Sequence, residues 1–186
     1  MIVALDLRNS FSLKKAMRIF TLFVLTTFLL SCKKQPFENE YENSLSAWMN
    51  FKKETNNSYK YTQVWYSWTG HSSEIMVTVR DGKIVARSYK AIGPDMENGE
   101  VIKTYAEWSE DETTLNSHSE STGASLTLDE IYLKAKNEWL NVSRDENEIS
   151  FETKNNGMIS SCGYVSKECA DDCFRGITIK EISKLI

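Results

Sequence analysis

Two tight reversals of chain direction constrain the fold of this sequence more than any other feature. Asp81-Gly82 separates the runs 74–80 and 83–89, in which apolar and polar residues alternate, and Asn156-Gly157 lies between two similar runs. Asp-Gly and Asn-Gly are preferred in two-residue type I′ turns, because both central positions need positive φ. The sequence therefore predicts two β-hairpins.

A two-residue loop also fixes the register of the strands that it joins. Counting outward from the first turn, Val79 faces Ile84 and Val77 faces Ala86, so these four side chains share one face. Arg87 falls on the opposite face with the polar residues. The pattern predicts a core face and a solvent face for this hairpin, with Arg87 in solvent.

Two segments have the apolar periodicity of amphipathic helices. Residues 37–54 carry a single apolar stripe, which is typical of a helix that packs on a core. Thr127 to Glu130 matches a capping box, in which the two side chains satisfy backbone N–H groups, and the helix that it starts reaches about Val142. The polar segment 109–125 has almost no apolar residue and is predicted to be a mobile loop.

The expected strands fall in two groups, one before and one after the second helix. They are 59–68, 74–80, 83–89 and 101–108 in the first group, and 148–153, 158–165 and 176–182 in the second. Short links between strands favour antiparallel pairing, and segregated strands and helices favour the α+β class. We therefore predict one curved antiparallel sheet of about six to seven strands with two helices packed on one face, in the order helix, four strands, helix, three strands.

The N-terminal region has the pattern of a secretory signal peptide. Lys14 and Lys15 precede an apolar run of about a dozen residues, which is too short to span a bilayer comfortably. The run ends in LLSC at 29–32, which resembles a bacterial lipobox. This resemblance implies removal of a lipoprotein signal peptide, residues 1–31, and acylation of Cys32 by diacylglycerol and a fatty acid such as palmitate. An ordinary secretion signal with a stray cysteine is the alternative.

Acylation would decide where the protein resides. Multiple acyl chains hold a protein on a membrane essentially permanently, at about 0.8 kcal/mol per buried methylene. We therefore expect a lipid-anchored protein of the bacterial cell envelope, at the outer membrane, with 32–42 as lipidated cysteine and tether and 43–186 as a single domain.

The charge of the mature chain restricts its partners. Removal of residues 1–32 takes away four of the 22 basic residues and one of the 26 acidic residues, which leaves a net charge of about −7. A negative net charge argues against nucleic acid as a partner. An envelope protein or a glycan remains as the expected partner, besides the membrane lipid.

Three further cysteines would lie in an oxidising compartment, which predicts one disulfide and one spare thiol. The longer loop favours Cys162 with Cys173, and Cys169 is the alternative partner of Cys162. A zinc site would need a fourth ligand. A thiol redox role at Cys169 and Cys173 is disfavoured, because acids between them raise the pKa of a thiol.

The first expected strand, 59–68, carries aromatic residues on both faces. In one interpretation, one set packs under the helices and a loop shields the other. In the other, exposed rings form a platform for a glycan or a peptide, because Trp and Tyr offer large rigid faces at small entropic cost. The candidate binding residues are Tyr61, Trp65 and Trp68.

No motif for catalysis or for a cofactor is found in the sequence. It has no Gly-rich phosphate loop and no HExxH, and both histidines, His71 and His118, lie in polar turns. We therefore expect no cofactor and no metal, and the leading hypothesis is a binding module. The alternatives are an envelope hydrolase or thiol-redox protein, which would need converging side chains in a pocket, and a purely structural envelope protein.

A set of short motifs runs from Trp48 to Ile182. They are Tyr59-x-Tyr61, Val77-x-Val79-Arg80-Asp81-Gly82-Lys83-Ile84, Thr127-Leu128-Asp129-Glu130-Ile131-Tyr132, a turn at Gly157, and Asp171-Asp172. On these motifs the chain resembles a family of small secreted bacterial proteins and lipoproteins known as a domain of unknown function. That family has Tyr-Asp-Pro before the second turn, where this chain has Phe151-Glu152-Thr153, and it has no assigned activity.

Overall fold

The computed structural model describes residues 37–95, 102–171 and 173–185. All of them belong to one unit, residues 35–186. The expected signal peptide, Cys32 and residues 33–36 of the expected tether lie outside the described residues. Among the residues that are described, no helix is long and apolar enough to cross a membrane.

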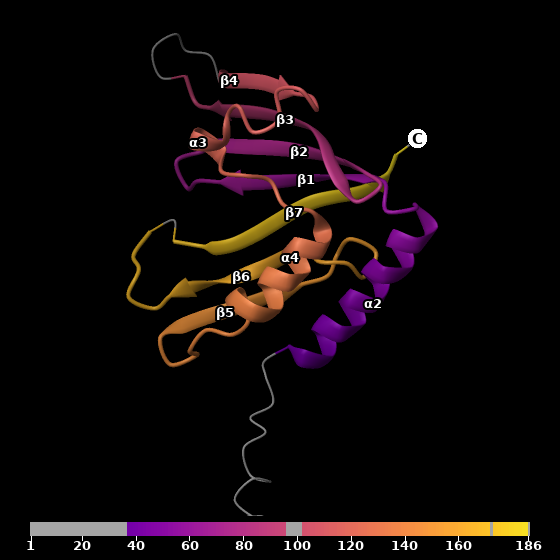
Figure 1. The fold of residues 1–186 in the computed structure, drawn as a ribbon. Helices are drawn as coiled ribbons and strands as arrows, with labels where there is room; N and C mark the ends of the chain where they lie inside the picture. The colour runs from indigo at the N-terminus through magenta and orange to yellow at the C-terminus, as the bar shows by residue number, and fades with distance from the viewer. Residues whose placement is uncertain (1–36, 96–101, 172, 186) are drawn as a thin grey trace, which may run out of the picture. The chain divides into compact units, whose positions relative to one another are not determined.

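Seven antiparallel strands form one open sheet in the order β4-β3-β2-β1-β7-β6-β5 (Figure 1). The strands are β1 (Tyr59–Tyr66), β2 (Ser72–Arg80), β3 (Lys83–Gly93), β4 (Lys103–Glu110), β5 (Asn147–Glu152), β6 (Ser161–Ser166) and β7 (Arg175–Lys184). The α+β class and the single antiparallel sheet are confirmed. The strand β7, which comes after all the others in sequence, lies inside the sheet, between β1 and β6.

The helices are α2 (Glu38–Glu54), the short α3 (Ser119–Thr122) and α4 (Leu128–Lys134), which continues as the π-helix η2 (Ala135–Trp139). Figure 1 shows α2 and α4 next to each other on one face of the sheet. Because α2 begins at Glu38, residues 38–42 of the expected tether are helical. The predicted capping box at the start of α4 is present.

Aromatic side chains join α2 and α4 to the sheet. Trp48 of α2 is fully buried, stacks on Tyr132 of α4 at 6.4 Å between ring centroids, and meets Tyr59 of β1 edge-on at 5.1 Å. The Trp48 indole also donates a hydrogen bond of 3.0 Å to Asp129, and the Tyr41 hydroxyl donates one of 3.0 Å to the Tyr132 carbonyl. These contacts form the centre of the hydrophobic core, because large rings bury much apolar area.

Both predicted turns are present. Asp81 and Gly82 have φ of 49° and 77°, and Asn156 and Gly157 have φ of 53° and 86°. In the second hairpin Phe151 faces Cys162, as predicted. The two reversals on which the sheet prediction depends are therefore confirmed.

The register predicted for the first hairpin is wrong beyond its first pairs. Val79 faces Ile84 as predicted, but Thr78 faces Ala86, because Val85 is an extra residue in β3. A bulge of one residue moves every later side chain of the strand to the other face of the sheet. Arg87, expected in solvent, is consequently buried on the core side.

Arg87 forms a buried ion pair that fixes the segment expected to be a mobile loop. Its guanidinium donates to the two carboxylate oxygens of Glu110 at 2.7 and 2.9 Å, and to the Gly123 carbonyl at 2.9 Å. Glu110 also accepts hydrogen bonds from the backbone N–H groups of Asn116 and His118, each at 2.8 Å. The segment that connects β4 to α4 is therefore held against β3 and β4.

Candidate binding cleft

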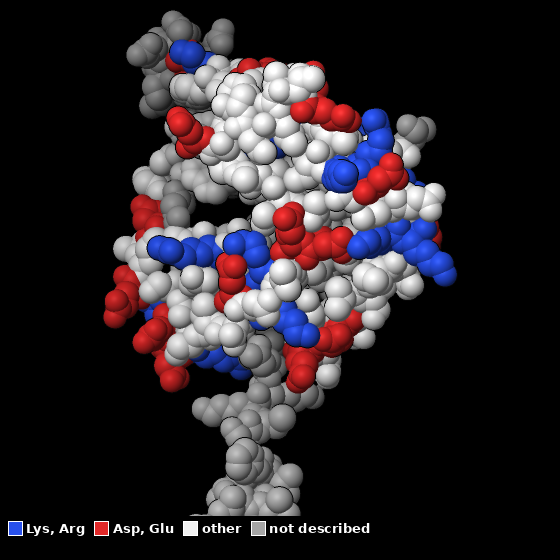
Figure 2. All heavy atoms as spheres, viewed as in Figure 1, with Lys and Arg blue, Asp and Glu red and all other residues white. Residues whose placement is uncertain are grey.

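The sheet is split where β1 and β7 part. β1 pairs with β7 only from Tyr59 to Gln63, and the register shifts at its end because Lys180 is an extra residue in β7. Residues 64–66 of β1 continue along β2, whereas residues 175–178 of β7 pair with β6. Figure 2 shows a hollow at the left of the view, between the part of the surface over β1–β4 and the part over β6 and β7.

The split contains a cleft of about 260 Å³. Its lining residues carry no charge, although acidic and basic residues are intermingled elsewhere on the face that Figure 2 shows. They come from the end of β1, the start of β7 and the residue before β7. They are Gln63, Val64, Trp65, Tyr66, Phe174, Gly176 and Thr178.

Aromatic side chains are exposed in this cleft and in the turn that follows β1. The exposed fractions are 47% for Trp65, 61% for Tyr66 and 40% for Phe174, and Trp68 in the turn after β1 is 75% exposed. Large exposed apolar side chains that lie together mark interaction sites on soluble domains. We call the cleft with these four side chains the aromatic cleft.

Two of the three predicted binding residues lie at the aromatic cleft, and one does not. Trp65 and Trp68 are exposed, as a binding platform requires. Tyr61 is only 1% exposed, because it faces Val77 on the core side of the sheet and its hydroxyl donates to the Leu126 carbonyl. Burial raises the pKa of this hydroxyl well above its ordinary value. Tyr61 is therefore a core residue, and its inclusion in the platform is wrong.

Phe174, which was not among the predicted binding residues, forms the β7 side of the aromatic cleft. Its ring lies against Gly163 of β6, where a Cβ atom would come within 2.6 Å of the ring. Gly163 faces Gly176 across β6 and β7. Two glycines that face each other in neighbouring strands leave room for a ring on the sheet, and this pair was the available signal.

The disulfide differs from the expected pairings. Cys169 and Cys173 are joined, with Cα atoms 6.3 Å apart, and Cys162 is a free cysteine. Cys162 is not bonded to either of them, because its side chain points into the core opposite Phe151. Burial raises the pKa of its thiol to about 12. The disulfide closes the loop between β6 and β7 directly before Phe174.

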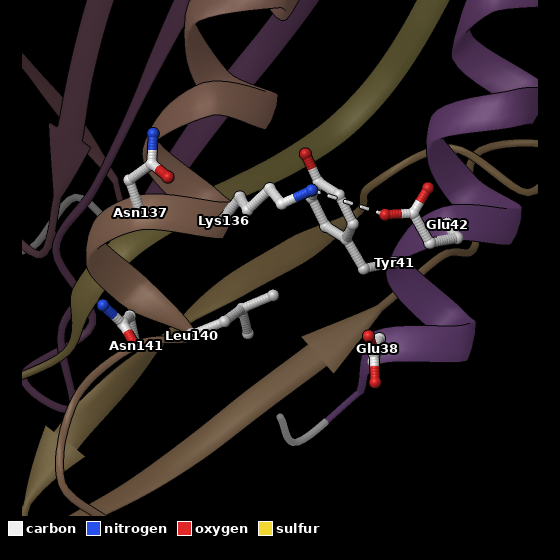
Figure 3. Close-up of a pocket in the computed structure, with 7 residues that line it drawn as sticks. All are labelled: Glu38, Tyr41, Glu42, Lys136, Asn137, Leu140 and Asn141. Atoms are coloured by element: carbon white, nitrogen blue, oxygen red, sulfur yellow. Dashed lines mark ion pairs between the residues drawn. The ribbon is translucent and has the colours of Figure 1, made fainter. Parts of the chain in front are cut away.

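A second hollow, of about 200 Å³, lies between α2 and η2 (Figure 3). Lys136 reaches from η2 toward α2, where its ammonium lies 3.5 Å from the Glu42 carboxylate and 5.5 Å from the centre of the Tyr41 ring. The only cation that Figure 3 labels is thus already paired with an acid. We therefore place the candidate site in the aromatic cleft.

Metal-ligating residue types and the histidine next to the buried ion pair were the remaining candidates for chemistry. In that part of the chain, no group of three or more His, Cys, Asp or Glu side chains could hold a metal ion. His118 stacks on Trp108 at 4.3 Å between ring centroids, and its Nδ1 lies 3.0 Å from the buried Glu110 carboxylate. This carboxylate is already bound by Arg87, so the contacts of His118 with Trp108 and Glu110 hold the segment after β4 in place.

The aromatic cleft lies where β1 and β7 part in an open antiparallel sheet. Comparisons of the chain with models of protein families, with curated proteins and with solved structures found no match. The resemblance to small secreted bacterial proteins and lipoproteins therefore stays a prediction from sequence motifs.

Proposed function

We propose that this protein is a lipoprotein of the bacterial cell envelope, anchored through Cys32, whose domain binds a partner through the aromatic cleft. The observation that carries the proposal is that three exposed aromatic side chains, Trp65, Tyr66 and Phe174, line a break in the sheet, with the exposed Trp68 two residues after the end of β1. The partner is an envelope protein or a glycan.

Exposed aromatic rings favour binding over a purely structural role. Each ring buries a large apolar area when a partner covers it, and Trp and Tyr are the residues that most often dominate binding energy. A domain without a partner would be more soluble without them. The cleft supplies the concave shape that lets several rings contact one ligand.

The alternative of a thiol-redox protein would depend on the disulfide of Cys169 and Cys173, because Cys162, the free cysteine in the described part of the chain, is buried. Cys169 and Cys173 are joined to each other, and Cys162 is buried with a raised pKa. A thiolate is the reactive form, so a buried thiol that stays protonated is a poor nucleophile. Cys162 is therefore a poor redox thiol, and the exposed aromatic side chains favour binding.

The proposal is tested by cross-linking of the full-length protein in its own envelope, followed by purification. We expect Trp65→Ala and Trp68→Ala to reduce the yield of the main cross-linked partner at least fivefold. Met49→Ala in α2 and Leu133→Ala in α4 are matched controls, because these side chains are 53% and 60% exposed outside the cleft. Equal yields from all four variants would contradict the proposal.

The anchor is tested separately. We expect Cys32→Ser to abolish incorporation of labelled palmitate and to move the protein from the membrane fraction to the soluble fraction, since an acyl anchor requires this sulfur. Cys162→Ser is the control, because its buried thiol takes no part in anchoring. Unchanged labelling of Cys32→Ser would contradict lipidation.

A further inference from the structure

The β1 wall of the aromatic cleft presents backbone hydrogen-bonding groups. The N–H of Ser67 donates to the His71 carbonyl at 2.8 Å, so Ser67 points its backbone groups toward β2. Successive residues of a strand point these groups alternately to its two sides. Val64 and Tyr66 therefore direct their N–H and C=O groups away from β2, into the cleft.

The β7 wall has the same property. The N–H of Ile179 donates to the Ser160 carbonyl at 2.7 Å, so Ile179 points its backbone groups toward β6. By the same alternation, Gly176 and Thr178 direct theirs toward β1. All four residues belong to the lining of the cleft, and the pairing of β1 with β7 ends before them.

Unpaired strand edges are normally shielded, because they pair with any extended chain that reaches them. Here two such edges lie inside a cleft with exposed aromatic rings. We infer that the ligand of the aromatic cleft is an extended polypeptide segment, which adds a strand to the edge of β1 at Val64 and Tyr66. This inference rests on the proposed function and narrows its partner to a protein.

The chemistry of the cleft describes the segment that it binds. Because the lining residues are uncharged, the bound residues are uncharged as well. Trp65 lies on the same side of β1 as Tyr61, and Tyr66 lies on the opposite side. The side chains of an added strand alternate in the same way, so apolar residues at alternate positions would contact both rings.

The peptide side of the inference is tested with linear peptides selected from a displayed library against the full-length protein in detergent. The selected peptide is then methylated at one backbone nitrogen at a time. N-methylation removes a donor, so we expect at least tenfold weaker binding at every second residue and less than threefold at the residues between. Losses of less than threefold at every residue would overturn the inference, and large losses at every residue would support pairing of the segment with both β1 and β7.

The protein side is tested by Tyr66→Pro against Tyr66→Ala. Both variants lose the ring, but only proline also loses the N–H that points into the cleft, while the groups that face β2 remain. We expect peptide binding to be at least tenfold weaker for Tyr66→Pro than for Tyr66→Ala. In the unaltered protein, bound peptide should slow hydrogen exchange at Val64 and Tyr66, and this measurement decides if Tyr66→Pro does not fold. Equal affinities of two folded variants, or unchanged exchange, would overturn the inference.

The outcomes separate this inference from the proposed function. If oligosaccharides but not peptides bind, and this binding is lost in Trp65→Ala and Trp68→Ala, the proposed binding function is supported and the inference of an added strand is wrong. Peptide binding that needs these rings but is insensitive to N-methylation has the same meaning. If no peptide or oligosaccharide depends on Trp65 or Trp68, the proposed function falls too.

Discussion

At the scale of single residues, the buried ion pair of Arg87 and Glu110 is the most demanding feature of the domain. Both side chains are fully excluded from solvent. A buried charge is tolerated only when it is paired and its remaining hydrogen-bonding positions are filled. Arg87 and the backbone of the segment after β4 fill these positions on Glu110.

We predict that Glu110→Gln lowers the free energy of unfolding at pH 7 by about 3 to 5 kcal/mol, because it leaves Arg87 buried without a counter-ion. Glu107→Gln in the same strand is the control. Glu107 forms an exposed ion pair with Lys90 at 3.3 Å, and its loss should cost at most about 1 kcal/mol. Urea unfolding of the variants measures both values, and similar losses would show that burial of the pair is unimportant.

The same pair predicts how stability changes with pH. The Arg87 guanidinium holds the pKa of the Glu110 carboxyl well below its ordinary range. A group whose pKa is lower in the folded state stabilises the fold above its unfolded pKa of about 4.3, and this contribution is lost as the pH falls further. The free energy of unfolding, measured from pH 7 to pH 2, should therefore depend less on pH in Glu110→Gln than in the unaltered protein. If the free energy of unfolding of the two proteins changed with pH in the same way, a lowered pKa of Glu110 in the folded state would be contradicted.

A second prediction at this scale concerns Cys162. Because burial raises the pKa of its thiol to about 12, we expect almost no alkylation by iodoacetamide at pH 8 in the folded protein. Denaturant should make the thiol react at the rate of a free cysteine. Alkylation at that rate in the folded protein would show that the side chain is accessible and would reopen a thiol function.

At the scale of elements, the loop between β6 and β7 holds one wall of the aromatic cleft. The disulfide of Cys169 and Cys173 closes a short loop that ends next to Phe174. In the chain-entropy treatment, such a loop stabilises the fold by about 2 kcal/mol. The disulfide therefore restricts where the Phe174 ring can lie.

We predict that the double variant Cys169→Ser and Cys173→Ser folds, loses about 2 kcal/mol of stability, and binds a selected peptide about three- to tenfold more weakly. The loss of peptide affinity should equal the loss caused by Phe174→Ala. A triple variant that combines all three substitutions should bind no more weakly than Phe174→Ala alone, since both changes act through the Phe174 ring. Calorimetric binding titrations measure these affinities. Additive losses would mean that the disulfide acts elsewhere.

Elements with strong local signals were predictable from the sequence, and irregularities within them were not. The turns at Asp81-Gly82 and Asn156-Gly157 and the cap at Thr127 each have a local cause, namely positive φ or an orphan N–H group. The bulge at Val85 depends on the pairing partner, and alternation alone assumed a regular strand. That one residue moved Arg87 from solvent to the core.

At the scale of the whole domain, the aromatic cleft arises because β7 changes its partner along its length. It pairs with β6 at its start and with β1 at its end. The sequence indicated exposed rings at Trp65 and Trp68, because one strand carried aromatic residues on both faces. It could not indicate the cleft, since β7 follows β1 by more than a hundred residues and their pairing is a tertiary contact.

Oxidative footprinting of the full-length protein tests the binding site most directly, by comparing intact envelopes with the purified protein. We expect Trp65, Tyr66, Trp68 and Phe174 to be oxidised at least threefold more slowly in envelopes, because a bound partner covers them. The exposed side chains of Met49 and Leu133 should react equally in both samples. Equal oxidation of the four aromatic side chains in envelopes and in solution would contradict a binding site at the aromatic cleft.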